Sequence, residues 1–316
     1  MGNSGALAKR IDPLQIRRYL RRYALLVVFI VMCIIFSISH ENFFTWGNLL
    51  DVIRSNAISG LAAIGLTYVV LSGGIDLSIE GVIALSGIIA GSLSYDPIMA
   101  VTASLSVGLL VGLINGFIIT RSGVQPFIYT LGANRAIQGI VLIFTRGISI
   151  YDVGPDFKII GKGSISGIPI PIWIFLILLA ITYLLLNHSK FGRYVYSVGS
   201  NEEASRLSGI KTNQVKMSVY LISGFLAALA GIVLTSRVAA AEATAATGWS
   251  LDALAAVIIG GTSLRGGQGG ILSTVLGIFL IGVLNNGMIL MNVPSNYYQF
   301  VKGTIIIIAV LIDSKK

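Results

Sequence analysis

The chain has 316 residues, of which 55% are hydrophobic and 11% are charged, and its mean hydropathy is +0.87. Soluble domains carry roughly 25% charged residues, so this composition excludes a soluble globular protein and predicts an integral membrane protein in a lipid bilayer. The formal net charge of +9 does not indicate nucleic-acid binding, because the basic residues are spread over the loops. Cys33 is the single cysteine, which excludes an intramolecular disulfide.

A strongly basic segment opens the chain before the first apolar run at 23–38. A cleaved signal peptide is the competing interpretation, but the basic segment is long and no small-residue cleavage site follows the run. We therefore predict that residues 1–22 form a basic cytoplasmic N-terminus. Residues 23–313 are then expected to form a single transmembrane domain.

Apolar runs continue along the chain at lengths that suit a bilayer core of about 30 Å. The predicted spans are 23–38, 57–71, 81–93, 98–119, 124–145, 169–186, 217–235, 251–260, 270–291 and 297–312. Most of the 22 lysines and arginines fall in the terminal segments and loops of one side, so the positive-inside rule predicts that both termini are cytoplasmic. The expected fold class is an all-α membrane protein of about ten transmembrane helices.

Two glycine-rich turns precede predicted spans at the cytoplasmic side. Glycine permits unusual backbone conformations, and the hydroxyl groups in both turns are expected to cap the following helices. A phosphate-binding loop is excluded because no Gly-Lys-Ser/Thr sequence ends the second turn. The residues predicted to form these broken-helix turns or gates are Gly73, Gly74, Asp76, Ser78, Gly260, Gly261, Thr262 and Ser263.

The longest polar interruption lies at 188–216 and is rich in lysine and arginine, which predicts a cytoplasmic loop. Asn201 is placed to cap a helix, Glu202 and Glu203 suit its first turn, and Gly209 is placed to end it. We expect a short cytoplasmic helix that contacts another protein. An ordinary polar loop is the alternative.

Polar residues inside predicted spans are candidates for a translocation path, because burying them in lipid is costly. Amides that join neighbouring helices are the alternative, and for each single residue this is the more common role. The candidates are Asn115, Asn134, Gln138, Asn285 and Asn286, with Arg135 near them.

The sequence offers no catalytic or metal-binding constellation. The only histidines are His40 and His188, each at a predicted membrane edge. Asp76 and Asp252 are isolated in the sequence near span ends and are expected to act as caps. We therefore expect neither an enzyme, a metal site nor a cofactor.

Four segments resemble one family of permeases. Glu203-Ala204-Ser205-x-x-x-Gly209 resembles the loop that permease subunits of binding-protein-dependent ABC importers use to dock on their ATPase. The segment 192–209, the turns at 73–81 and 259–269, and Asn285-Asn286-Gly287 resemble the subgroup that imports ribose, xylose, galactose and related monosaccharides. The resemblance extends over residues 42–313.

The chain departs from this family pattern at four places. Ser205 replaces an alanine, and the Ile-x-Leu-Pro sequence of the general motif is missing. Glu80 replaces a small residue and is expected to place a charge near the inner membrane surface. Gln138 stands where the family usually has arginine, and Arg135, one helical turn earlier, is a candidate to replace it.

The resemblance implies the transmembrane subunit of a monosaccharide importer in a bacterial inner membrane. It implies a fold similar to the vitamin B12 importer's permease, a homodimer, a cytoplasmic ABC ATPase, and a periplasmic or extracellular sugar-binding protein. Residues assigned by it to the ATPase-coupling loop are Gly199, Asn201, Glu203, Ala204, Arg206, Ser208 and Gly209.

Two other functions remain open at this stage. An ion-coupled secondary transporter of a small polar solute would normally carry a carboxylate in mid-span, and the sequence shows none clearly. A membrane scaffold without a transport path is the third interpretation, which the polar residues inside spans disfavour.

Overall fold

The computed structural model describes residues 13–314, with side chains described at 25–294, 297–305 and 307. Its elements as far as the seventh helix are α1 (Pro13–Ser39), α2 (Trp46–Leu71), α3 (Ile79–Ser92), α4 (Pro97–Ser122), α5 (Pro126–Thr145), α6 (Pro155–Lys162), β1 (Ser164–Ile165), β2 (Ile168–Pro169) and α7 (Ile170–His188). The remaining elements are α8 (Lys190–Ser200), α9 (Glu202–Leu207), α10 (Thr212–Val238), α11 (Trp249–Ile259), α12 (Ile271–Leu290) and α13 (Ser295–Ser314).

Every predicted span coincides with a helix, which confirms a predominantly helical membrane fold. Within the described part of the chain, α2, α4, α5, α7, α10 and α12 are the six helices that are long and apolar enough to cross a membrane. Segment Leu25–Ser39 of α1, with α3 and α11, is apolar but shorter. The total of about ten spans therefore stays a prediction.

The sequence analysis missed four elements and misjudged two helix starts. Helices α6 and α8 and the antiparallel hairpin β1–β2 lie in segments that it treated as loops. Helix α2 begins at Trp46, well before the expected start of that span, and residues 13–22 continue α1. The remainder of the expected basic terminus, residues 1–12, lies outside the described residues, as do residues 315–316.

Local sequence signals explain the ends of α4. The Asp96 carboxylate accepts hydrogen bonds from the backbone N–H groups of Ile98 and Met99, and Pro97 occupies the first turn. Gly123, with φ of 66°, ends the helix in the left-handed conformation that glycine adopts readily. These features fix a tight turn before α4 and another before α5.

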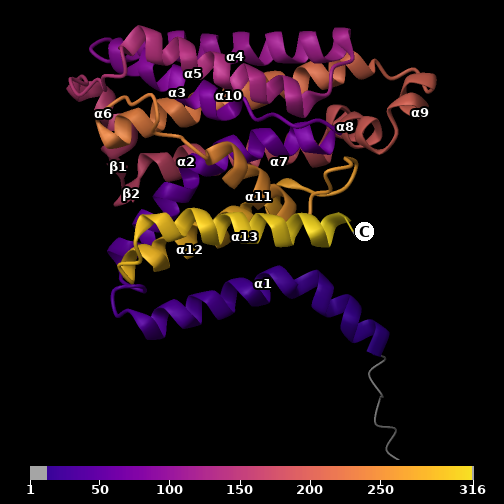
Figure 1. The fold of residues 1–316 in the computed structure, drawn as a ribbon, viewed down its shortest axis with the longest axis horizontal. Coiled ribbons are helices and arrows are strands. Elements are labelled where there is room, and N and C mark those ends of the chain that lie inside the picture. The colour runs from indigo at the N-terminus through magenta and orange to yellow at the C-terminus, as the bar shows by residue number, and fades with distance from the viewer. Residues whose placement is uncertain (1–12, 315–316) are drawn as a thin grey trace, which may run out of the picture.

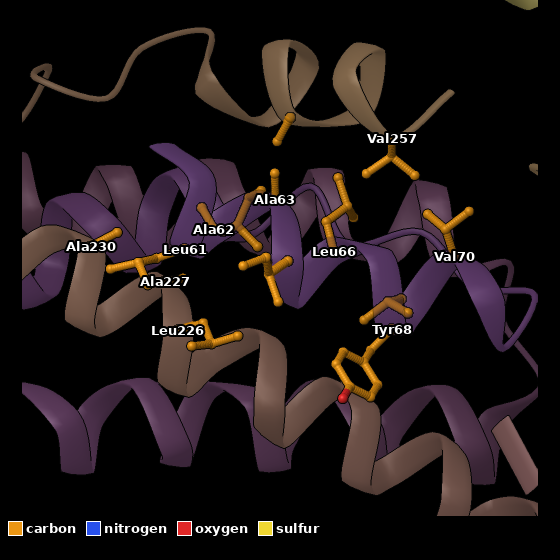
Figure 2. Packing of buried hydrophobic residues seen from close by; sticks show 14 of the residues in the cluster. Leu61, Ala62, Ala63, Leu66, Tyr68, Val70, Leu226, Ala227, Ala230 and Val257 are labelled. Carbon is orange, nitrogen blue, oxygen red and sulfur yellow. The ribbon is translucent and has the colours of Figure 1, made fainter. Parts of the chain in front are cut away.

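Helices α2 and α10 form the centre of the bundle. Leu61 and Tyr68 of α2 pack with Leu226 of α10 in the largest apolar cluster (Figure 2). A side chain at Gly108 of α4 would collide with the backbone of Gly224 in α10. Small residues thus allow close helix contact where no hydrophobic effect operates between lipid-embedded helices.

The two ends of the bundle differ in what they carry. Figure 1 shows α6 and the β1–β2 hairpin at one end, and α8 and α9 at the other. The first turn of α1 and the last turn of α13 lie at the same end as α9 (Figure 1). This arrangement agrees with an even number of crossings between the described chain ends.

Candidate functional site

The short helix α9 forms as its local sequence predicts. The Asn201 side chain accepts a hydrogen bond of 2.9 Å from the Ala204 backbone N–H and so caps the helix. Gly209 has φ of 84° beyond its end. The Glu203 carboxylate lies 2.7 Å from the Arg206 guanidinium, and this hydrogen-bonded pair lowers the pKa of Glu203. Both side chains are exposed, so the pair contributes little to stability.

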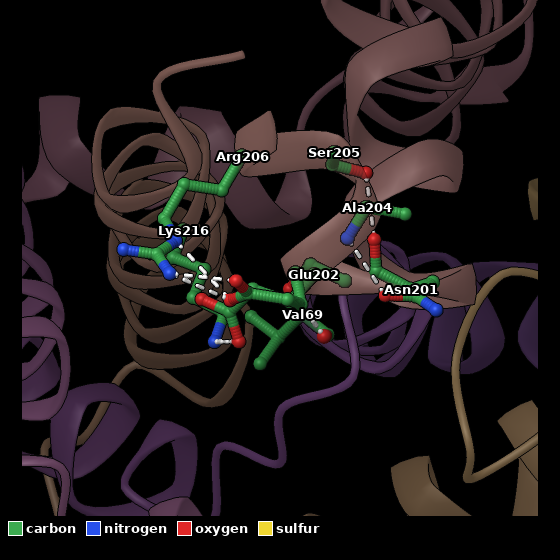
Figure 3. Close-up of polar contacts among 9 residues, drawn as sticks. Val69, Asn201, Glu202, Ala204, Ser205, Arg206 and Lys216 are labelled. Carbon is green, nitrogen blue, oxygen red and sulfur yellow. Dashed lines mark hydrogen bonds and ion pairs between the residues drawn. The ribbon is translucent and has the colours of Figure 1, made fainter. Parts of the chain in front are cut away.

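Helix α9 is attached to its neighbours on one side only. The Ser205 hydroxyl is buried and lies 2.8 Å from the Ser197 hydroxyl of α8. Figure 3 shows Glu202 of α9 paired with Lys216 of α10. Ser208 ends the helix, and its N–H donates to the Ala204 carbonyl. Leu207, which the sequence analysis did not select, leaves 78% of its surface exposed. The other side of α9 is therefore an open contact surface.

Gly199, at the end of α8, brings the predicted coupling loop and both glycine-rich turns together. A side chain on Gly199 would overlap the Leu71 carbonyl at the end of α2 and the Gly267 N–H. That N–H itself donates to the Leu71 carbonyl at 2.9 Å. Gly73 and Gly266 also lie against Gly199. The ends of α2, α8 and the segment after α11 thus meet in one backbone junction.

The first turn, between α2 and α3, is held by a buried carboxylate. Asp76 is 1% exposed and accepts hydrogen bonds from the Ser78 hydroxyl at 2.6 Å and the Ser223 hydroxyl of α10 at 2.7 Å. Asn115 of α4 donates to the Ser78 hydroxyl at 2.8 Å. The expectation that Ser78 caps α3 is wrong, because its side chain makes no cap hydrogen bond and is used in this network. Gly74 lies against Tyr220 of α10.

The second turn also differs from the expected caps. Gly260 ends α11, and Gly261 follows with φ of 87°. The helix that follows is preceded by Gly270, so neither hydroxyl residue is its cap. Thr262 is buried and its hydroxyl accepts from the Gly270 N–H at 3.4 Å, whereas Ser263 accepts from Arg265 within the turn.

A cavity of about 460 Å³ lies among α2, α11, α12 and α13, with one wall residue from the end of α10. This volume falls in the range of small-molecule sites. The polar and aromatic residues of its wall are Asn48, Asp51, Ser55, Asn56, Ser59, Arg237, Trp249, Asp252, Asn285, Asn286 and Lys302. Within the described residues no group of His, Cys, Asp and Glu could hold a metal ion.

Charge on the cavity wall is partly neutralised by an ion pair. The Asp252 carboxylate lies 2.6 Å from the Lys302 ammonium, and each side chain is 25% exposed. Asp252 therefore bonds α11 to α13 and is not the isolated cap that the sequence analysis expected. The rest of the polar wall combines neutral amides and hydroxyls with the charged side chains of Asp51 and Arg237.

The five predicted translocation residues separate into two groups. Asn285 and Asn286 line the cavity, and Asn286 exchanges hydrogen bonds of 3.0 and 2.7 Å with Asn48 of α2. The other three lie in helix contacts away from the cavity. Asn115 belongs to the Asp76 network, Asn134 is buried against Gly81 of α3, and Gln138 bonds to α3.

Glu80, which was expected to place a charge near the inner membrane surface, is buried inside the helix bundle. It is 6% exposed, and its carboxylate accepts from Gln138 of α5 at 2.8 Å and from the Gly248 N–H and Ser250 hydroxyl of α11 at 3.0 Å each. Arg135 donates to Gln138 at 3.1 Å. Glu80 and Asp76 show that the bundle does bury carboxylates. The sequence analysis had argued against an ion-coupled transporter because it found no clear carboxylate inside a span, and that argument no longer holds.

These features define a polytopic helical membrane protein with a polar cavity and a short exposed helix at one end. Residues 48–310 match the family described as the permease component of branched-chain amino acid transport systems. The chain belongs to this family of membrane permeases.

Curated relatives cover nearly the whole chain. The ribose import permease of Bacillus subtilis strain 168 is 43% identical over 291 residues, which cover 90% of each chain. The ribose import permease of Escherichia coli K12 is 40% identical over 298 residues, covering 92% of this chain and 93% of the relative. The L-arabinose transport system permease of E. coli K12 is 35% identical over 303 residues, covering 93% and 91%. No solved structure matches the chain.

Proposed function

We propose that this chain is the transmembrane subunit of an ABC importer that moves a monosaccharide across a bacterial inner membrane by ATP-driven alternating access. The relatives named above are sugar permeases, whereas the description of the family refers to branched-chain amino acids. The cavity favours a sugar, because neutral amides and hydroxyls bind hydroxyl groups and the charges in it are partly paired. Ribose is the first substrate to test.

The proposal that α9 couples a bound ATPase to the cavity rests on one structural observation. The exposed helix α9 continues from α8, whose Gly199 contacts the end of α2 and the segment that follows α11. Helices α2 and α11 both line the cavity. Movement of α9 by a bound ATPase is therefore delivered to two walls of the cavity through backbone contacts. We further propose that the glycine-rich turns act as the rigid parts of this connection, because Asp76 and Ser78 are buried and fully hydrogen-bonded.

The proposed assembly contains two copies of this chain and an ABC ATPase on the cytoplasmic side. Helix α9 is the ATPase contact, so the end of the bundle that carries it faces the cytoplasm. A sugar-binding protein delivers substrate at the opposite end, near α6 and the β1–β2 hairpin. This orientation is the one that the distribution of lysine and arginine predicts.

An ion-coupled transporter is the second candidate, and the buried carboxylates of Asp76 and Glu80 favour it. The two functions differ in their partners. Purification from bacterial membranes in mild detergent, with mass spectrometry of the bound proteins, should recover an ABC ATPase in stoichiometric amount. Recovery of the chain without an ATPase, even after crosslinking, would reject the importer and favour the ion-coupled transporter.

A further inference from the structure

Two amide groups on the cavity wall lack hydrogen-bond partners. Asn56 of α2 is 5% exposed, and its Nδ2 atom is buried without a partner. The Oδ1 atom of Asn285 in α12 is also buried without a partner. Nearby, Asn48 and Asn286 satisfy each other. Buried polar groups are almost always hydrogen-bonded, so the two unsatisfied groups require an explanation.

The two groups lie on facing helices at the same part of the cavity. The Asn56 amide packs directly on Gly282 of α12, where any side chain would overlap it. Gly282 and Asn285 are three residues apart on one helix and therefore share a face. All three residues line the cavity. A buried donor on α2 and a buried acceptor on α12 thus belong to residues that line one cavity.

A hydroxyl group fits this pair, because its oxygen accepts one hydrogen bond and its hydrogen donates another. The oxygen would accept from Asn56 Nδ2, and its proton would be donated to Asn285 Oδ1. Both amides are neutral, so the pair offers a carboxylate or an ammonium group no counter-charge. The Trp249 ring on the same wall offers an apolar surface to the carbon skeleton of a sugar.

We infer that Asn56 and Asn285 form a hydroxyl-binding subsite, which holds one hydroxyl of a neutral polyhydroxylated ligand during its passage through this cavity. The inference rests on the proposed function and adds the residues and the chemical group that they recognise. It also assigns a role to Asn56, which lies outside the span expected from the sequence.

The inference is tested by uptake of radiolabelled D-ribose into proteoliposomes that contain this chain, its ATPase and its binding protein. Asn56→Leu and Asn285→Leu should each lower the initial uptake rate about tenfold, the effect of losing one hydrogen bond. The double variant should lose little more than either single variant, because both amides bind the same hydroxyl. Asn187→Leu, an exposed asparagine on α7, is the matched control and should transport normally.

Isosteric variants separate binding from folding. Asn285→Asp keeps an acceptor and should retain most of the uptake, whereas Asn56→Asp removes the donor and should transport as poorly as Asn56→Leu. Sugar-independent ATP hydrolysis should be unchanged in all variants. Equal uptake by Asn56→Asp and Asn285→Asp, or wild-type rates in both leucine variants, would overturn the subsite. Failure of the wild-type assembly to import either D-ribose or L-arabinose, the sugars named for its relatives, would instead reject the proposed sugar function, and the subsite with it.

Discussion

The Glu80 carboxylate accepts a hydrogen bond of 2.8 Å from the Gln138 side chain, which joins α3 to α5. At both positions the chain departs from the permease pattern that its motifs resemble. The other carboxylate oxygen of Glu80 accepts from Gly248 and Ser250 at the start of α11. Two apparently independent departures therefore form one contact, and that contact holds the first turn of a cavity-lining helix.

Replacing Glu80 with alanine should destabilise the protein. The change leaves donors on Gln138, Gly248 and Ser250 without their acceptor, and we expect a loss of about 3 kcal/mol in the free energy of unfolding. Glu80→Gln should cost less, because its carbonyl oxygen still accepts. Thermal unfolding in detergent provides the measurement.

Glu203→Ala is the matched control for Glu80, since Glu203 makes only an exposed ion pair. It should change the free energy of unfolding by no more than about 0.5 kcal/mol. Similar destabilisation by Glu80→Ala and Glu203→Ala would contradict the proposed role of the buried contact.

Valine at position 209 should block transport without unfolding the bundle. Gly209 has φ of 84°, where a β-branched residue is strained, but no atom lies near enough to be displaced. The expected effect is therefore a change in the orientation of α9 alone. ATP-driven uptake should fall at least tenfold while the elution volume in detergent stays that of the wild type.

The control for this substitution is Gly123→Val. Gly123 has φ of 66° and ends α4 in equally open space. Valine at this position therefore introduces the same kind of backbone strain at a different turn. This variant should transport at close to the wild-type rate. If Gly209→Val also transports at close to the wild-type rate, the proposal that α9 couples the ATPase to transport is rejected.

A charge at Leu207 should weaken binding of the ATPase. This side chain is 78% exposed at the end of α9 and contributes little to the fold. Exposed apolar side chains of this kind are typical anchors of protein interfaces. In co-purification, Leu207→Asp should retain less than about a tenth of the ATPase that wild type retains.

Ile165→Asp is the comparison for Leu207→Asp, because Ile165 is 55% exposed on β1 at the opposite end of the bundle. It should retain the ATPase fully. Loss of ATPase binding in both variants would indicate a general defect and would count against a specific α9 interface.

Cysteines at positions 201 and 164 should be labelled from opposite sides of the membrane. Residue 201 precedes α9, and residue 164 begins β1 at the other end (Figure 1). The native Cys33 is first replaced by serine. A membrane-impermeant maleimide applied to intact spheroplasts should label position 164 only; labelling of both positions from that side would refute the topology.

Local features of the sequence were sufficient to predict α9 and the helices that occupy the long apolar runs. The Asn201 cap, the acidic first turn and Gly209 are adjacent in the chain, and all three occupy the expected places. Helix α8 was missed although Gly192, Val195 and Val198 mark its buried face at helical spacing. The general rule that amphipathic helices show such spacing could have found it.

The site was less predictable because its contacts join distant segments. Glu80 meets residues far along the chain in α5 and α11, which no local pattern indicates. Asn56 was excluded because the apolar run was taken to start at the next residue, whereas the capping Thr45 starts α2 much earlier. Asn285 and Asn286, selected from the sequence as translocation-path candidates, do line the cavity, but the cavity itself depends on how five helices pack.

The most direct test of the central claim is ribose uptake into proteoliposomes that contain the chain, its ATPase and its binding protein. The account predicts uptake that requires internal ATP and the binding protein, and that continues after an ionophore has removed all ion gradients. Uptake that persists without ATP and stops when the ion gradients are removed would contradict the ATP-driven importer and support an ion-coupled transporter.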